Sequence, residues 1–280
     1  MSIPSTPRSV GLYYAESPQL TRPGEQTWIT RSANLLVVLS RVEAGTRLER
    51  RDHPDEYMVL LPHGVRVSVS TPEGRVDAGP ESLTIVPPGD SAVEVQEAGT
   101  ITRIFSVRAT DLAALAPNAG VYAHGAPSVA PLEDWPMPPE GYKLRHYRLT
   151  EYNDPKIFGR IFRSRNLMIN VLAPVSEKRD PRKMSPHSHP DFEQISLALE
   201  GSFVHHLRAP WGPDSTLWQE DEHLEVHSPS TLVIPAHLIH TTAWTGEGVN
   251  WLVDVFAPPR MDFSLQPGVV RNAHEYPLPK

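Results

Sequence analysis

The sequence has no cysteine, no cluster of basic residues and no long apolar run. Without cysteine there is no disulfide framework and no thiolate chemistry. The formal net charge is −7 and no Lys/Arg run stands out, which argues against nucleic acid or a membrane surface as a partner. No apolar run approaches membrane-spanning length, and residues 1–10 lack the apolar core of a signal peptide. We therefore expect a cytoplasmic protein.

Helical patterns are scarce as well, whereas short strand-like runs recur along the whole chain. Only Thr110 to Leu115 has a helical pattern. Apolar or alternating runs bounded by turn residues lie at 35–39, 57–61, 65–69, 83–86, 167–172, 195–199, 231–234 and 251–256. The 30 prolines are scattered along the chain, as is typical of a protein with many turns. The pattern predicts an all-β fold.

Three segments of the first half recur in the same order in the second half. The matched pairs are 31–34 with 163–166, 53–55 with 189–191, and 82–89 with 230–237. Three collinear matches favour a duplicated domain. Because residues 117–141 are rich in Pro, Gly and Ala, they read as a linker. We place the boundary near residue 130, which gives one domain at 1–130 and another at 131–280.

Histidine is concentrated in one window of the second domain. Eight of the 13 histidines lie between His187 and His240. His187 and His189 are two residues apart in a strand-like segment, so their side chains share a face and can converge on one ion. His240, which follows a later strand and turn, is the candidate third ligand. Three neutral imidazoles would leave coordination positions for substrate, water or dioxygen.

These residues resemble the motifs of the cupin superfamily, and the duplication resembles its bicupins. The first family motif is His-x-His, three or four residues, Glu, six residues and Gly, which the segment 187–201 fits. The second is Pro-x-Gly-x-x-His, which 235–240 matches with His237 in place of the glycine. The resemblance implies two tandem cupin barrels, each a double-stranded β-helix or jelly roll, and one divalent metal ion bound in the second.

The fourth ligand position is left open between two neighbouring residues. Counting back from Gly201 places Gln194 at the family's Glu position, whereas Glu193 is the stronger ligand but lies one residue early. A shift of one residue moves a side chain to the opposite face of a strand, so both cannot point at the metal without a bulge. We favour His187, His189 and His240 with Gln194 beside them.

The first domain lacks the equivalent ligands. Ala92 stands at the position of His240. Of the two histidines in the first motif, only one has a counterpart here, which is His53. The sequence therefore predicts a degenerate cupin domain without a metal site, with a structural or dimerising role.

For function, the resemblance favours a non-haem Fe(II) dioxygenase that acts on a small organic acid, for example an aromatic one, as gentisate-type dioxygenases do. A weaker likeness connects the chain to pirins. One alternative is a redox-neutral isomerase or lyase with Zn, Mn or Ni, in which His205 or Glu193 would move a proton. Another is a non-enzymatic ligand-binding cupin. We expect an anionic small-molecule substrate, no nucleic acid or membrane partner, and a homodimer.

Overall fold

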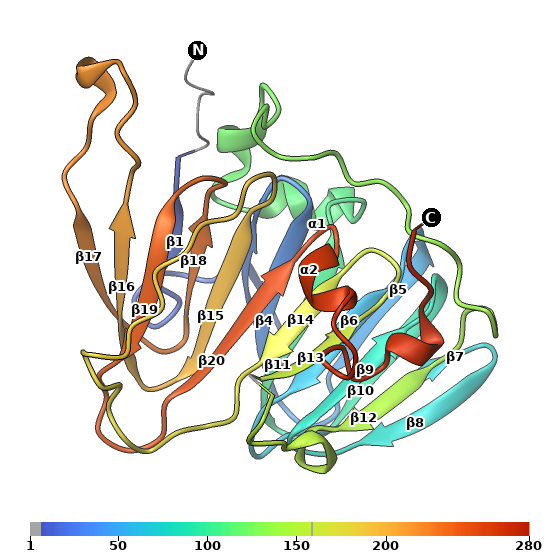
Figure 1. The fold of residues 1–280 in the computed structure, drawn as a ribbon. Coiled ribbons are helices and arrows are strands. Elements are labelled where there is room, and N and C mark those ends of the chain that lie inside the picture. Colours follow the sequence, from blue (N-terminus) through green and yellow to red (C-terminus); the bar gives the residue numbers. More distant parts are fainter. Residues whose placement is uncertain (1–6, 158, 280) are drawn as a thin grey trace.

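The computed structural model describes residues 7–157 and 159–279, and their regular secondary structure is mostly β-strand (Figure 1). The predicted helix is present as α1 (Thr110–Leu115), and a second one, α2 (Met261–Ser264), lies near the C-terminus. Four short 3-10 turns are η1 (Ala119–Tyr122), η2 (Leu149–Tyr152), η3 (Ser215–Leu217) and η4 (Ala273–Glu275). No helix in the described ranges is long and apolar enough to cross a membrane.

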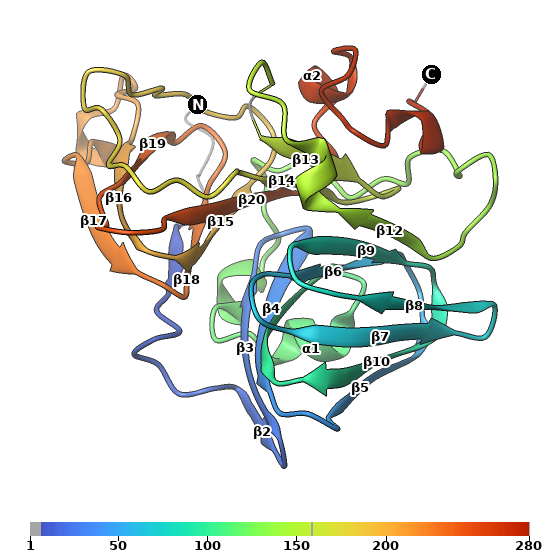
Figure 2. The same cartoon turned by 90° about the horizontal axis from the view of Figure 1, so that it is seen from below.

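The strands form two antiparallel barrels that lie side by side, one for each half of the chain (Figure 2). This arrangement confirms the predicted all-β fold with two tandem jelly-roll barrels. Each barrel consists of a larger and a smaller sheet that face one another.

The N-terminal barrel takes most of its strands from the first half of the chain. They are β2 (Leu20–Arg22), β3 (Glu25–Arg31), β4 (Leu35–Val42), β5 (Arg47–His53), β6 (Tyr57–Leu61), β7 (Arg66–Thr71), β8 (Gly74–Ala78), β9 (Ser82–Val86), β10 (Gly89–Glu97), β11 (Gly99–Ser106) and β12 (Arg145–Arg148). The larger sheet has the order β12-β9-β6-β11-β4-β3-β2 and the smaller one β5-β10-β7-β8.

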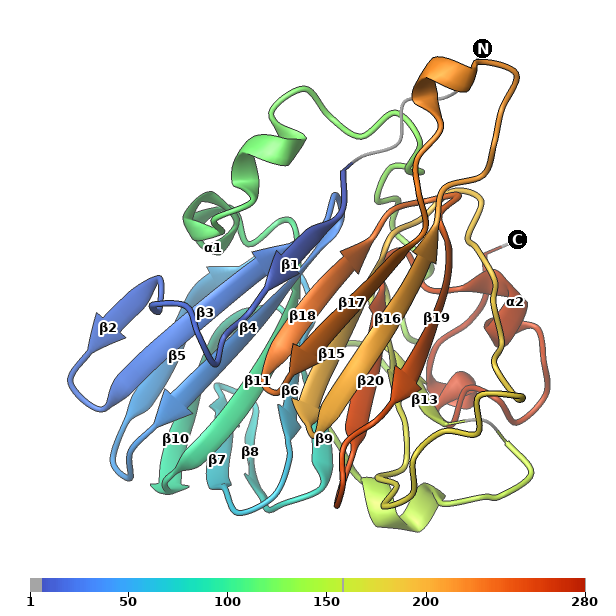
Figure 3. The ribbon, with the colours of Figure 1, turned by 90° about the vertical axis from the view of Figure 1, so that its left-hand side faces the viewer.

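The C-terminal barrel repeats this plan. Its strands are β1 (Ser9–Gly11), β13 (Arg160–Arg163), β14 (Met168–Val171), β15 (Gln194–Glu200), β16 (Ser202–Arg208), β17 (Glu222–His227), β18 (Ser230–Ile234), β19 (Ile239–Trp244) and β20 (Trp251–Phe256). The larger sheet has the order β1-β18-β15-β20-β14-β13. Figure 3 shows the smaller sheet, β17-β16-β19, in front of it.

The two halves exchange one strand each. The N-terminal strand β1 pairs with β18 of the C-terminal barrel, where Ser9 lies opposite Val233. The strand β12, which follows the linker, pairs with β9 of the N-terminal barrel, where Arg145 lies opposite Ile85. The sheets therefore do not separate at residue 130, because each half of the chain supplies a strand to the other half's larger sheet.

The largest apolar core lies between the two larger sheets. Met58 and Leu60 of β6 are fully buried there, together with Ile195 and Leu197 of β15. Since side chains alternate along a strand, the residues between them point into the two barrels. The register that packs the barrels against each other therefore also decides which side chains line each interior.

Candidate metal centre

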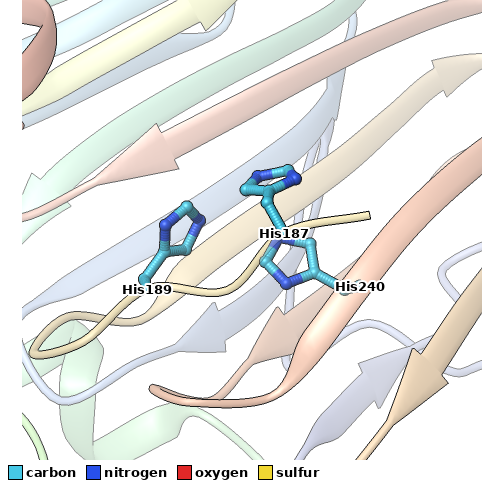
Figure 4. Close-up of side chains that lie close together, drawn as sticks. All are labelled: His187, His189 and His240. Carbon is cyan, nitrogen blue, oxygen red and sulfur yellow. The ribbon is translucent and has the colours of Figure 1, made fainter. Parts of the chain in front are cut away.

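His187, His189 and His240 come together in the C-terminal barrel, His240 from β19 and the other two from the segment before β15 (Figure 4). The segment that carries His187 runs beside β19, and the two residues exchange backbone hydrogen bonds, from His240 N to His187 O over 2.8 Å and from His187 N to His240 O over 3.1 Å. His189 follows on the same face. One ligand atom from each imidazole lies within 4.8 Å of the other two.

Two of the imidazoles are oriented by backbone carbonyls. Nδ1 of His187 donates to the carbonyl of Ser185 over 2.9 Å, and Nδ1 of His240 donates to that of Leu238 over 2.9 Å. This hydrogen bond fixes the tautomer and leaves Nε2 as the ligating nitrogen. Nε2 of His240 is buried and has no hydrogen-bond partner among the described residues. A buried nitrogen of this kind is costly unless something binds it, so the site fits a metal ion.

Burial keeps two of these imidazoles in the ligating, neutral form. His189 and His240 are buried, whereas His187 is exposed. Burial, and to a smaller extent neighbouring histidines and Arg260, lowers the pKa of His189 to about 3 and that of His240 to about 4. Metal binding requires the unprotonated ring, so these two side chains are ready to bind at neutral pH.

Gln194 extends the site into the barrel. Its Oε1 lies 3.0 Å from Nε2 of His189. Its Nε2 donates to Ser196 Oγ and Asp254 Oδ1, each over 2.8 Å, and the Ser196 hydroxyl also donates to Asp254 over 2.6 Å. Burial raises the pKa of Asp254 above its ordinary value, although the Ser196 hydrogen bond partly opposes this shift. The barrel therefore holds a carboxyl group that takes up a proton more readily than an exposed aspartate does.

Glu193 does not join the three imidazoles. It lies one residue before Gln194 and its side chain faces the N-terminal half, where Oε2 accepts from Ala33 N over 2.7 Å. The Tyr122 hydroxyl donates to the same oxygen over 3.1 Å. The physical reason is the alternation of side chains along the strand: because Gln194 points into the barrel, Glu193 points toward the other domain.

His205 lies inside the barrel near the site. Its Nδ1 is 2.8 Å from Thr242 Oγ1, opposite it on β19. Burial, and to a smaller extent the charges of His240 and His206, lowers the pKa of His205 to about 4. His206, the next residue, points outward and contacts His223 instead. The structure thus places His205 in the interior as a neutral imidazole.

Sequence reasoning missed two charged residues near the site, Asp254 and Arg260. Asp254 is the one charged residue in the otherwise apolar strand β20. That single charge was the sequence signal that could have indicated a functional residue there. The Arg260 guanidinium lies 5.6 Å from the centre of the Phe192 ring, which stacks on His189 with ring centres 4.4 Å apart. Asp262 binds Nε and Nη2 of Arg260. Nothing local in the sequence indicated Arg260, because the chain leaves β20 before reaching it.

The equivalent place in the N-terminal barrel is filled by rings. His53 lies edge-on to Tyr57 and Phe105, with ring centres 5.4 and 5.3 Å away. Burial, and to a smaller extent Arg50, lowers the pKa of His53 to about 4. Ala92 pairs with Glu49, which is bound to Arg47. The only cluster of three or more metal-ligating side chains in the described ranges is the triad of the C-terminal barrel.

The fold is similar to that of known cupin proteins. A variant of the oxalate decarboxylase of Bacillus subtilis matches with a TM-score of 0.61 and 15% identity, covering 95% of this chain and 83% of that chain. The formate complex of the Lactobacillus farciminis oxalate decarboxylase matches with a TM-score of 0.59 and 14% identity, covering 90% of this chain and 86% of that chain. A Cupin 2 conserved barrel domain protein from Leptotrichia buccalis is 9% identical, with a TM-score of 0.49 and coverages of 92% and 99%. No protein-family model matches the sequence, and no curated protein matches it either. At these identities the likeness concerns the fold.

Proposed function

We propose that this chain is a metal-dependent cupin enzyme in which His187, His189 and His240 hold one divalent ion, with Gln194 beside it. The observation that carries the proposal is the convergence of three imidazoles within 4.8 Å, of which His240 has a buried Nε2 without a partner among the described residues. A bound ion would supply Lewis-acid activation of a small acid or, as Fe(II), a place for dioxygen to react. We propose Fe(II) first, with Zn, Mn or Ni as alternatives.

For the reaction class, we propose a dioxygenase that acts on a small organic acid, for example an aromatic one. The donor set supports this choice, because the cluster of ligating residues in the described ranges contains three histidines and no carboxylate. Neutral donors keep the positive charge of the ion available for an anionic substrate. Arg260 adds a cation, and Arg260→Gln should raise the KM for an anionic substrate more than it lowers kcat.

Asp254 favours a second candidate, a redox-neutral lyase or isomerase. This carboxyl lies inside the barrel beside Gln194 and Ser196, and burial raises its pKa. A carboxyl with a raised pKa in such a place can exchange a proton with a carbanion or an enolate. The similar structures are named as oxalate decarboxylases, although they share only the fold with this chain.

Metal analysis of protein purified without oxygen and without added metal tests the proposal. Near-stoichiometric iron, together with oxygen uptake on hydroxylated aromatic acids, would support the dioxygenase. Stoichiometric zinc, manganese or nickel, with turnover of oxalate or a related acid in the absence of oxygen, would support the lyase. Protein that stays metal-free after reconstitution would contradict both and leave a ligand-binding cupin.

Two neighbouring substitutions test the ligand set. Gln194→Ala should weaken metal binding, because its amide contacts His189. Glu193→Gln serves as the matched control, since its carboxylate binds Ala33 and Tyr122 across the domain interface. It should therefore lower stability and leave metal affinity unchanged. The reverse pattern would contradict the assignment of Gln194. The homodimer and the cytoplasmic location remain predictions from the sequence.

A further inference from the structure

A hollow of about 270 Å³ lies where the linker passes the N-terminal barrel, and none of the three histidines lines it. Arg31, Ala33, Asn34 and Tyr122 form its inner wall, and linker residues between 125 and 131 form the rest. None of these side chains belongs to the candidate metal centre. The duplicated architecture allows this place to be compared with its equivalent in the other half.

The residues around the hollow have counterparts that make the same contacts. Asn118 Oδ1 accepts from Arg31 N, and Asn118 Nδ2 donates to Arg31 O. In the second half, Asn272 Oδ1 accepts from Arg163 N and Asn272 Nδ2 donates to Arg163 O. This identical pattern makes Arg163 the equivalent of Arg31.

The tyrosines that follow these asparagines are equivalent too. Tyr122 and Tyr276 each lie four residues after the asparagine. The Tyr122 hydroxyl donates to Glu193, and the Tyr276 hydroxyl donates to Glu56 over 2.8 Å. By the same alignment Ala33 corresponds to Arg165, whose backbone N–H donates to Glu56 as that of Ala33 does to Glu193.

In the second half, Trp135 lies in this place, with its indole against Arg163 and its backbone against Arg165 and Asn166. Trp135 is 8% exposed and its ring centre lies 4.8 Å from the guanidinium carbon of Arg163. Its backbone N–H donates to Asn166 Oδ1 over 3.3 Å, and its carbonyl accepts from Arg165 Nε. Trp135 therefore contacts the counterparts of three residues that line the hollow.

The first half offers the same partners without the ring. The Arg31 guanidinium lies over Tyr122, with 4.8 Å from its central carbon to the ring centre, and Nε donates to Ser32 O. Within residues 7–157 and 159–279, no hydrogen bond engages either Nη of Arg31 or Oδ1 of Asn34. A flat cation and an acceptor thus border the hollow at the positions that hold Trp135 in the other copy.

We propose that the hollow binds a planar aromatic molecule that carries a hydrogen-bond donor, of the indole or phenol class. The ring stacks on Arg31, because a guanidinium over an aromatic face is attractive, and the donor binds Asn34 Oδ1. A cavity of about 150 Å³ holds a benzene ring, so the volume here accommodates two fused rings. This site is independent of the proposed metal chemistry.

Calorimetric titration with indole tests the proposal directly. Wild-type protein should bind indole saturably, and 1-methylindole, which lacks the N–H donor, should bind more weakly. Ala126→Trp fills the hollow and should abolish binding. Ala123→Trp, at an exposed position outside the hollow, is the matched control and should bind like wild type. No saturable binding to wild type, or undiminished binding to the Ala126 variant, would overturn the proposal.

Removing the indole from the other copy gives a second test. Trp135→Ala should open an equivalent hollow, so that the variant binds two indoles where wild type binds one. Indole should also raise the Tm of this variant more than that of wild type. A variant that still binds one indole would refute the equivalence of the two places. If it does not fold, the Ala126 and Ala123 pair decides the proposal.

Discussion

The two barrels use the same strand positions for opposite purposes. Tyr57 and Val59 of β6 point into the N-terminal barrel and fill it, whereas Gln194 and Ser196 occupy the equivalent positions of β15 and line a polar interior. One continuous apolar cluster fills the N-terminal barrel, while the C-terminal one has small separate clusters.

The difference shows where the C-terminal barrel obtains its stability. The interior of the C-terminal barrel holds the histidines, Gln194 and Asp254, so this interior cannot form a large apolar core. Its outer face compensates, because Ile195 and Leu197 pack in the core that the two barrels share. The N-terminal barrel thus serves as the scaffold on which a polar interior can be built.

The largest effect should come from the histidine that one barrel has and the other lacks. His240→Ala should abolish metal binding, because it removes one of the three proposed ligands. His53→Ala, at the equivalent of His189, should leave the metal content unchanged. Elemental analysis of both variants after anaerobic purification checks this, and full metal occupancy in the His240 variant would refute the site.

A substitution in the interior should cost far more stability in the filled barrel than in the polar one. Tyr57 is fully buried, stacks on Phe105 with ring centres 4.8 Å apart and bonds to Ser91. Tyr57→Ala should lower the free energy of unfolding by about 3–5 kcal/mol, the usual cost of truncating a buried aromatic. Ser196→Ala should cost about 1 kcal/mol, a typical hydrogen-bond loss. Urea denaturation measures both, and similar losses would contradict the proposed difference between the barrels.

The matched tyrosines at the interface should respond alike. Tyr122→Phe and Tyr276→Phe each remove one hydrogen bond to a buried carboxylate, of Glu193 or Glu56. Hydrogen bonds to charged groups contribute about 1.5–3 kcal/mol, so each variant should lose stability in that range while retaining its metal. Unfolding curves combined with metal analysis test this pair. A loss confined to one variant would show that the two contacts are not equivalent.

The features predicted correctly were those that depend on a short, local stretch of sequence. The bounds of α1 and β6 match the predicted ranges, because apolar periodicity and turn residues act locally. The three histidines were found because the motif spacing places two on one face of a strand. Their approach to within 4.8 Å confirms that convergence.

The features that were missed depend on contacts between distant segments. The exchange of β1 and β12 joins residues far apart in the chain, and both strands are short. Asp254 could be placed in the interior only once its pairing with Ser196 was known. Trp135 lies in a proline-rich linker with no periodic pattern, and its role follows from Arg163 and Asn166 beside it.

The smallest expected effect concerns the turn that leads into the last motif histidine. His237 has φ 68°, where the equivalent Gly89 has φ 101°, and a side chain makes this left-handed conformation costly by about 1–2 kcal/mol. Glycine also increases the conformational entropy of the unfolded chain, which offsets part of this stabilisation. His237→Gly should therefore raise the free energy of unfolding by about 0.5–1 kcal/mol, and Gly89→Ala should lower it by a similar amount.

The His237 N–H donates to His189 O, and glycine retains that bond, so metal content should not change. Loss of metal in His237→Gly would show that the imidazole itself supports the site, and that the departure from the family's glycine serves metal binding.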